Sequence, residues 1–175
     1  TIVNNESADI LRMMNSGFGD LADQSVDLYP EALRADIDAL NERIYPKLNN
    51  GVYRAGFATT QVAYEEAFRD VFDMLDELEE RMSDGRQFLF GDALTEADIR
   101  LFVTLVRFDV AYYGLFKCNQ RRLVDYPHLN DYLLRTLDIP GVRETVNIDH
   151  IKAGYYSIKA LNPTGIVPVG PELPF

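Results

Sequence analysis

The chain has 175 residues, of which 47% are hydrophobic and 26% charged, and its formal net charge is -11. These values are typical of one well-packed globular domain, or of one domain with part of another. The acidic balance argues against a nucleic-acid or anionic-membrane partner, because both require a basic surface, and no apolar run is long enough to cross a membrane. A single Cys excludes an internal disulfide and favours a reducing compartment, so we expect a cytoplasmic protein.

The first residues predict a short helix. Asn5, Glu6 and Ser7 are residue types that begin helices. The apolar residues that follow at helical spacing are Ala8, Ile10, Leu11 and Met14. The segment SGFGDLADQSVDLYPE, with two Gly, many polar groups and a Pro, then predicts a linker. Because Thr1 is not Met and the helix signal begins at once, we expect a piece of a longer protein.

Two longer helices are predicted next. From Pro30, apolar residues recur at spacings of three and four, which is a helical period. These residues are Leu33, Ile37, Leu40 and Ile44. Thr59 or Thr60 caps a second helix that ends near Gly85. Between the two helices, NNGVYRAGF contains two Gly and predicts a loop that carries Tyr53.

The segment from Phe88 to Asp109, FLFGDALTEADIRLFVTLVRFD, combines a helix start with a helix body. Thr95 is an N-cap candidate, and Asp98 three positions later completes a capping box. The body is apolar on nearly every side, as a buried helix is. We therefore expect it to be the central helix of the fold.

The last third of the chain predicts shorter helices and an extended tail. Pro127 and Pro140 each suit a first helical turn, and Asn147 or Asp149 can cap a last helix that includes Tyr155. The tail NPTGIVPVGPELPF contains four Pro and predicts extended chain. No segment alternates as a strand does, so the sequence predicts an all-α bundle.

Several motifs resemble one family of proteins. LTEADIRLF, after an FL-x-G run, resembles the central-helix signature of the C-terminal helical domain of the glutathione S-transferases. With NNESADI, NNGVYRAGFATTQ, TLVRFD, FKCN, ETVN, DHIK and NPTGIVP–GP, the chain resembles over its whole length the S-glutathionyl-hydroquinone reductases, the xi-type members of that superfamily. The resemblance implies a glutathione S-transferase C-terminal-type bundle.

The resemblance also implies how the chain is divided. Residues 1–14 would be the last helix of a thioredoxin-like domain that is otherwise missing, and residues 15–29 a linker. Residues 30–160 would form the helical C-terminal domain, and residues 161–175 a Pro/Gly-rich tail. We expect a homodimer, with glutathione as the cofactor.

The implied chemistry is removal of glutathione from S-glutathionyl-hydroquinones by thiol–disulfide exchange. The family's nucleophilic Cys lies in a Cys-Pro motif of the thioredoxin-like domain and has no counterpart here, so we expect this chain alone to be inactive. The alternative is a non-enzymatic interaction or assembly module, because helical domains of this kind also serve only assembly.

Glu6 and Ser7 can bind an amino-acid head group. A carboxylate beside a hydroxyl at a helix amino end offers an acceptor for an ammonium and donors for a carboxylate. The alternative is an ordinary helix cap. The resemblance implies that this pair binds the γ-glutamyl group of glutathione.

Tyr53 and Tyr155 are the candidate substrate-facing residues. A buried Tyr often fills space and bonds its hydroxyl to a backbone carbonyl, which is the alternative for both. The resemblance implies that they line the hydroquinone pocket, bond the ring hydroxyls and assist protonation of the ring carbon. Gly154 departs from the family pattern, because some relatives carry a larger polar residue there.

Cys118, in the bent and partly helical connection AYYGLFKCNQRR, has apolar neighbours and lacks a helix amino end or a Cys-Pro context, which favours a structural role. His128 and His150 have no Cys or carboxylate at a spacing that would bind a metal with them. We therefore expect no metal site.

Overall fold

A computed structural model of the chain describes residues 2–21, 23 and 25–175. Within these residues there are seven α-helices and no β-strand, only an isolated bridge between Phe88 and Gly91. The predicted all-α class is confirmed. The helices are α1 (Ser7–Ser16), α2 (Arg34–Ile44), α3 (Gly51–Gly56), α4 (Gln61–Met82), α5 (Glu96–Arg107), α6 (Pro127–Leu137) and α7 (Ile148–Tyr156).

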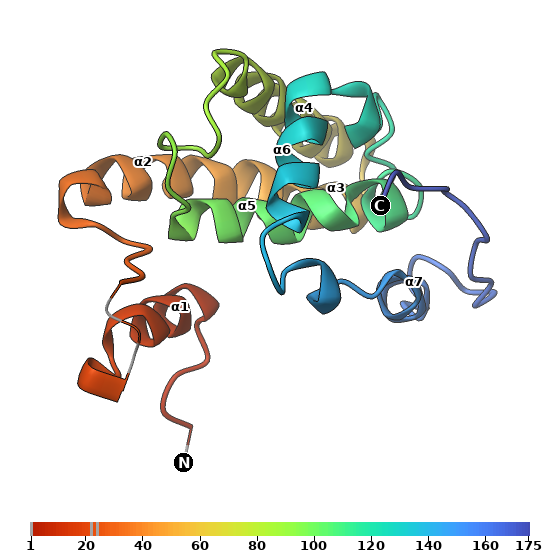
Figure 1. The fold of residues 1–175 in the computed structure, drawn as a ribbon. Helices are drawn as coiled ribbons and strands as arrows, with labels where there is room; N and C mark the ends of the chain where they lie inside the picture. The colour runs from red at the N-terminus through yellow and green to blue at the C-terminus, as the bar shows by residue number, and fades with distance from the viewer. Residues whose placement is uncertain (1, 22, 24) are drawn as a thin grey trace.

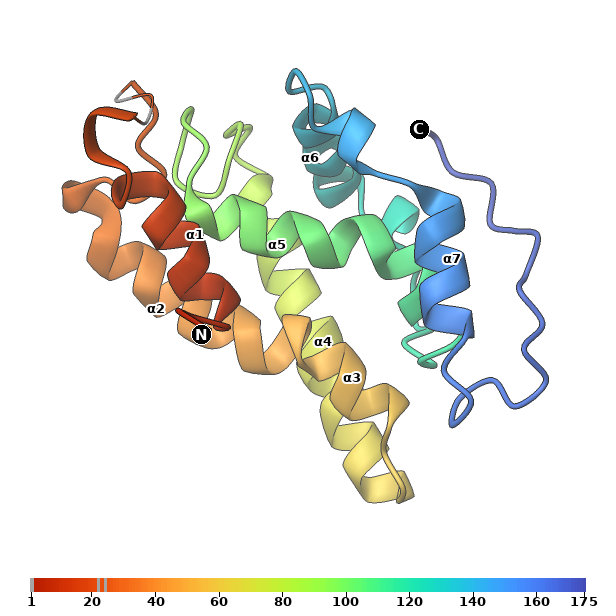
Figure 2. The same cartoon turned by 90° about the horizontal axis from the view of Figure 1, so that it is seen from below.

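Helix α5 lies in the middle of the bundle, as its apolar surface predicted. It packs against α2 on one side and α6 on another, while α3 packs along α4 (Figure 1). Helix α7 lies beside the carboxyl end of α5, and α1 lies beside α2 and the amino end of α5 (Figure 2). Both ends of α5 therefore meet elements that are distant in the sequence.

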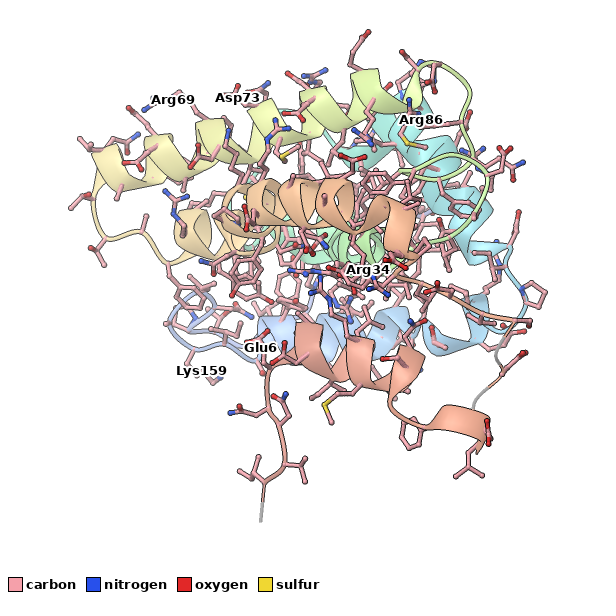
Figure 3. All side chains as sticks on the ribbon, turned by 90° about the vertical axis from the view of Figure 1, so that its left-hand side faces the viewer. Glu6, Arg34, Arg69, Asp73, Arg86 and Lys159 are labelled. Atoms are coloured by element: carbon pink, nitrogen blue, oxygen red, sulfur yellow. The ribbon has the colours of Figure 1, made fainter. Side chains whose placement is uncertain are left out.

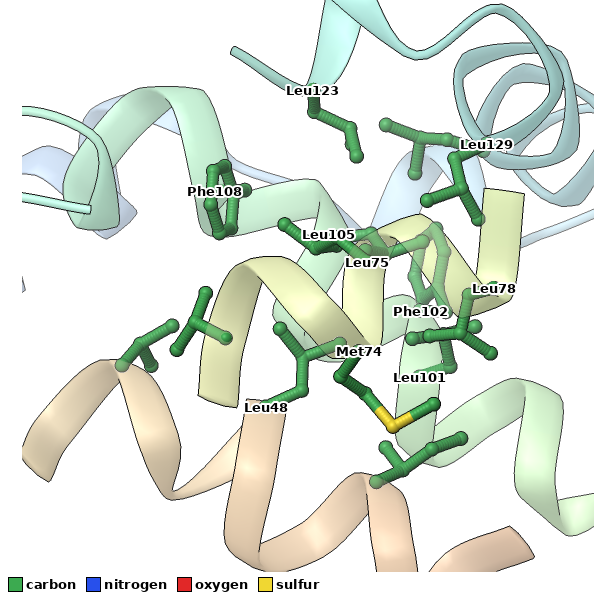
Figure 4. Packing of buried hydrophobic residues seen from close by; sticks show 14 of the residues in the cluster. Leu48, Met74, Leu75, Leu78, Leu101, Phe102, Leu105, Phe108, Leu123 and Leu129 are labelled. Atoms are coloured by element: carbon green, nitrogen blue, oxygen red, sulfur yellow. The ribbon is translucent and has the colours of Figure 1, made fainter. Parts of the chain in front are cut away.

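Helix α4 is amphipathic. Charged residues on its outer face, such as Arg69 and Asp73, point away from the bundle (Figure 3). Its inner face inserts Met74, Leu75 and Leu78 into the core, where they meet apolar side chains of α5 and α6 (Figure 4). Burial of this apolar area is the main force that holds the bundle together.

The prediction of a loop at NNGVYRAGF is wrong. A π-helical segment, Tyr45–Asn49, continues α2 almost directly into α3, so Tyr53 lies on a helix. The Gly residues here serve close packing. A Cβ on Gly56 would lie 2.2 Å from the Phe116 ring, and one on Gly51 would lie 3.0 Å from a side chain of α4.

The structure confirms most of the predicted helix starts but not the one at Pro140. Thr60, and not Thr59, caps α4, and Asn147 caps α7 by accepting a hydrogen bond from a backbone N–H. Pro127 opens α6 as predicted. Pro140 does not open a helix, because Gly141 beside it has a φ of +85° that a right-handed helix cannot include.

The last residues run extended along the outside of the bundle (Figure 2). The buried Lys152 of α7 donates a hydrogen bond from Nζ to the Val169 carbonyl at 2.6 Å, which fixes the tail against α7. At the other end of the chain, Ala22 and Gln24 of the predicted linker and Thr1 lie outside the described residues. No helix in the described part is both long and apolar enough to span a membrane.

Candidate functional site

Three tyrosine hydroxyls meet at one point between α3, α5 and α7. The oxygen of Tyr155 lies 2.7 Å from that of Tyr53 and 2.6 Å from that of Tyr112, and the Tyr53 and Tyr112 oxygens are 3.4 Å apart. The structure thus brings Tyr53 and Tyr155 together. Tyr112, at the end of a π-helical segment (Phe108–Tyr112) that prolongs α5, is a third member that the sequence did not single out.

The buried Phe116 holds the three rings in place. Its centroid lies 5.3 Å from the rings of Tyr53 and Tyr112 and 5.7 Å from that of Tyr155, each in edge-to-face geometry. Such contacts stabilise aromatic pairs beyond the area they bury. The hydroxyls therefore project from a rigid aromatic base.

The phenols of Tyr112 and Tyr155 keep their protons at neutral pH. Burial raises the pKa of Tyr155 to about 12 and holds the pKa of Tyr112 well above its ordinary range. A protonated phenol can donate a hydrogen bond to a ligand hydroxyl or a proton to a reacting atom. Tyr53 is 36% exposed, so this cluster is accessible to a ligand from outside.

A cleft of about 380 Å³, here called the tyrosine cleft, opens in front of these hydroxyls. It is lined by Glu6, Ser7, Ala8, Tyr45, Asn49, Tyr53, Arg100, Val103, Thr104, Arg107, Tyr112 and Tyr155. A second cavity of about 500 Å³, here called the α7 cavity, lies between α5 and α7. Tyr53, Val103, Arg107 and Tyr155 line both, so the two spaces are adjacent.

Glu6 and Ser7 border the tyrosine cleft. Glu6 lies at the amino end of α1 (Figure 3). Glu6 is the N-cap of α1, and its carboxylate accepts a long hydrogen bond of 3.4 Å from the Ala8 N–H. Glu6 thus caps the helix, and both residues line the same cleft as the tyrosines. The cap therefore does not exclude the ligand-binding role that the sequence set against it, and that role stays a prediction.

An ion-pair cluster, here called the Arg12 clamp, fixes α1 on the bundle. The Arg12 guanidinium donates to Glu96 at 2.6 and 2.9 Å and to Asp38 at 2.6 Å, and it lies 4.0 Å above the Tyr29 ring. The Tyr29 hydroxyl donates to Asp38 at 2.6 Å and, together with Arg12, holds the pKa of this carboxyl below its usual value. No residue of α1 is buried, so polar contacts such as this clamp attach the helix.

Thr95 and Asp98 form a capping box that fixes the start of α5. One Asp98 oxygen accepts hydrogen bonds from the N–H and the hydroxyl of Thr95, both at 2.8 Å. The other accepts from the Leu89 N–H at 2.9 Å and from the Tyr132 hydroxyl at 3.0 Å. Burial raises the pKa of Asp98, and these hydrogen bonds oppose that shift.

Cys118 is fully buried, and burial raises the pKa of its thiol to about 12. The thiol is therefore protonated at neutral pH, unlike a nucleophilic Cys. Among the residues that the structure describes, no group of three or more His, Cys, Asp or Glu side chains is placed to hold a metal ion.

Residues 61–135 match the family described as "Glutathione S-transferase, C-terminal domain". The helical bundle is of the glutathione S-transferase C-terminal type. The tyrosine cleft is lined by residues of α3, α5, α7 and the two π-helical segments, together with the start of α1.

The chain is similar to two curated reductases over nearly all of its length. It is 56% identical over 174 residues to the glutathionyl-hydroquinone reductase PcpF of Sphingobium chlorophenolicum, covering 99% of this chain and 55% of that protein. It is 52% identical over 172 residues to the glutathionyl-hydroquinone reductase YqjG of Escherichia coli K12, covering 98% and 52%. The chain therefore spans about half the length of these relatives.

Solved structures agree with these similarities. The glutathione-bound structure of YqjG from Escherichia coli superposes with a TM-score of 0.95 at 50% identity, covering 99% of this chain and 56% of that one. The glutathione S-transferase Xi from Phanerochaete chrysosporium superposes with a TM-score of 0.94 at 49% identity, covering 98% and 56%. The predicted resemblance to reductases and to xi-type transferases is confirmed.

Proposed function

We propose that this chain is the substrate-binding helical part of a glutathione-dependent reductase that removes glutathione from S-glutathionyl-hydroquinones. The observation that carries the proposal is the convergence of three phenols in the cleft that Glu6 and Ser7 also line. The names of the similar reductases support the reaction class. We propose further that residues 1–14 belong to a thioredoxin-like domain, residues 15–29 to a linker, residues 30–160 to the helical domain and residues 161–175 to a tail.

The end of the cleft at Glu6 and Ser7 suits the γ-glutamyl group of the substrate, and the end at the tyrosines suits its hydroquinone ring. The Glu6 carboxylate can accept hydrogen bonds from the γ-glutamyl ammonium, while Ser7 and the N–H groups at the start of α1 can donate to the γ-glutamyl carboxylate. The hydroquinone ring then reaches the tyrosines, where Tyr53 and Tyr155 bond its hydroxyls. Tyr112 supports Tyr155 from behind through the 2.6 Å hydrogen bond.

The reaction needs a thiolate, which we place on a Cys of the thioredoxin-like domain, because Cys118 is buried and protonated. The thiolate attacks the glutathione sulfur, the bond from that sulfur to the ring carbon breaks, and a mixed disulfide forms. The ring carbon takes up a proton, delivered with the help of the tyrosines. A second glutathione thiolate then attacks the mixed disulfide and releases glutathione disulfide. We propose that the enzyme is a cytoplasmic homodimer.

The proposal predicts a fixed stoichiometry. The full-length protein, given S-glutathionyl-hydroquinone and excess glutathione, should release one hydroquinone for each glutathione disulfide, measured by chromatography of quenched samples. The chain of residues 1–175 alone should show no turnover. If the full-length protein also shows no turnover, the reductase proposal is wrong. A non-enzymatic assembly module would then be the better interpretation.

The same assay tests the tyrosines. Tyr53→Phe and Tyr155→Phe should each lower kcat about tenfold or more, because each removes a hydrogen bond and a proton donor at the ring. Tyr156→Phe is the matched control, since Tyr156 is the next residue of α7 but does not line the cleft. Equal effects of Tyr155→Phe and Tyr156→Phe, or wild-type rates in both site variants, would contradict the assignment.

A further inference from the structure

Gly154 in α7 is a glycine that the fold itself does not require. Its backbone lacks the positive φ found at other glycines of the described chain. A Cβ added to it would meet no atom within 4 Å, whereas a Cβ on Gly56 would clash with Phe116 at 2.2 Å. Glycine inside a helix destabilises that helix relative to alanine. The absence of a side chain at this position therefore has a cost and no structural explanation.

Gly154 lies on the face of α7 that lines the α7 cavity. His150 and Ile151, four and three residues before it in α7, line the same cavity, and so does Ile158 just after the helix ends. Residues spaced by three or four lie on one helix face. A side chain at position 154 would therefore lie beside those of His150 and Ile151 and occupy part of the cavity.

The α7 cavity is suited to an apolar aromatic group. Its volume of about 500 Å³ is in the range of small-molecule sites. Its apolar lining residues are Phe102, Val103, Val106, Val146, Ile151 and Ile158. Because Tyr53 and Tyr155 line both spaces, a ring whose hydroxyls bond these tyrosines can extend any further group into the α7 cavity.

We infer that position 154 determines how large the aromatic part of the substrate can be, because a side chain there would fill the part of the α7 cavity that a second fused ring would occupy. The inference rests on the proposed function for the identity of the substrate. The structural part of the inference can be tested by binding, without turnover: the α7 cavity admits a second ring because position 154 has no side chain.

Binding of stable glutathione thioethers to the full-length protein tests this inference. S-benzylglutathione carries one ring and S-(1-naphthylmethyl)glutathione carries two, and titration calorimetry gives the Kd of each. Gly154→Leu should weaken binding of the two-ring ligand about tenfold or more and change that of the one-ring ligand less than about twofold, since only the second ring meets the added side chain. Gly154→Ala, which adds one methyl group, should give a smaller loss in the same direction.

Ala153→Leu is the matched control. Ala153 is exposed on α7 and does not line the α7 cavity, so the same added volume should leave both Kd values unchanged. Equal losses for the one-ring and two-ring ligands in Gly154→Leu, or no loss for either in both Gly154 variants, would overturn the inference. Absence of turnover with S-glutathionyl-hydroquinone would overturn the proposed function instead, while the ratio of the two Kd values would still decide the role of Gly154.

Discussion

The buried carboxylate of Asp98 has more partners than a helix cap needs. It accepts hydrogen bonds from Leu89, Tyr132 and both donors of Thr95. Asp98→Ala leaves these donors without an acceptor and should lower the free energy of unfolding by about 2–4 kcal/mol, because each unsatisfied buried group is costly. Thr95→Ala removes part of the cap alone and should cost about 1 kcal/mol.

Thermal or denaturant unfolding of both single variants and the double variant measures these costs. The double variant should lose less than the sum of the two, because the residues share two hydrogen bonds. Equal losses in the single variants would mean that Leu89 and Tyr132 contribute nothing to the stability of this site. Fully additive losses would mean that the capping box does not act as a unit.

At the scale of single residues, spacing predicted local partners and missed distant ones. Thr95 and Asp98 are three positions apart, so their contact can be read from the chain. Tyr132 meets the same carboxylate from α6, 34 residues away, and leaves no local signal. Tyr112 was missed for a related reason: the sequence predicted a bent, partly helical connection there, but its contacts with Tyr53 and Tyr155 are made across the fold.

At the scale of elements, the attachment of α1 should depend on pH. Asp38 has a pKa below its ordinary value because it accepts hydrogen bonds from Tyr29 and Arg12. A depressed folded-state pKa stabilises the attachment above the unfolded value of about 4 and loses this contribution as the pH falls through the folded value. Acidification below about pH 4 should therefore release α1 before the core of the bundle unfolds.

Hydrogen exchange measured by mass spectrometry between about pH 5 and pH 3, corrected for intrinsic rates, tests this dependence. Protection should fall over α1 and persist over α4 and α5. Asp38→Asn should give a weaker attachment at pH 5 and a smaller change on acidification. Protection of α1 that is lost only together with the core would show that the Arg12 clamp does not govern its attachment.

Helices were predicted correctly where nearby residues in the sequence determine the start of the helix. The prediction failed where a contact with a residue distant in the sequence determines the structure. The starts of α4, α6 and α7 carry their own caps or prolines, and the structure has helices there. The glycines before and after Tyr53 indicated a loop, because glycine most often marks one. Here position 56 requires a glycine because the Phe116 ring packs directly against it. This contact cannot be predicted before the fold is known.

At the scale of the whole molecule, the tyrosine cleft lies between the start of α1 and the rest of the bundle. Glu6 and Ser7 reach the tyrosine cleft from a helix that is held by polar contacts such as the Arg12 clamp. Several apolar side chains of α1 are exposed, including Ile10, Met13 and Met14. The proposed thioredoxin-like domain would cover such a surface and bring a thiolate to the open side of the cleft.

The most direct test of this account is a crystal structure of the full-length protein with S-glutathionyl-hydroquinone bound, in a variant whose nucleophilic Cys is changed to Ser. We expect the γ-glutamyl head at Glu6 and Ser7 and the ring hydroxyls within hydrogen-bond distance of Tyr53 and Tyr155. A ligand whose ring lies outside the tyrosine cleft, with both phenols bonded only to protein, would contradict it.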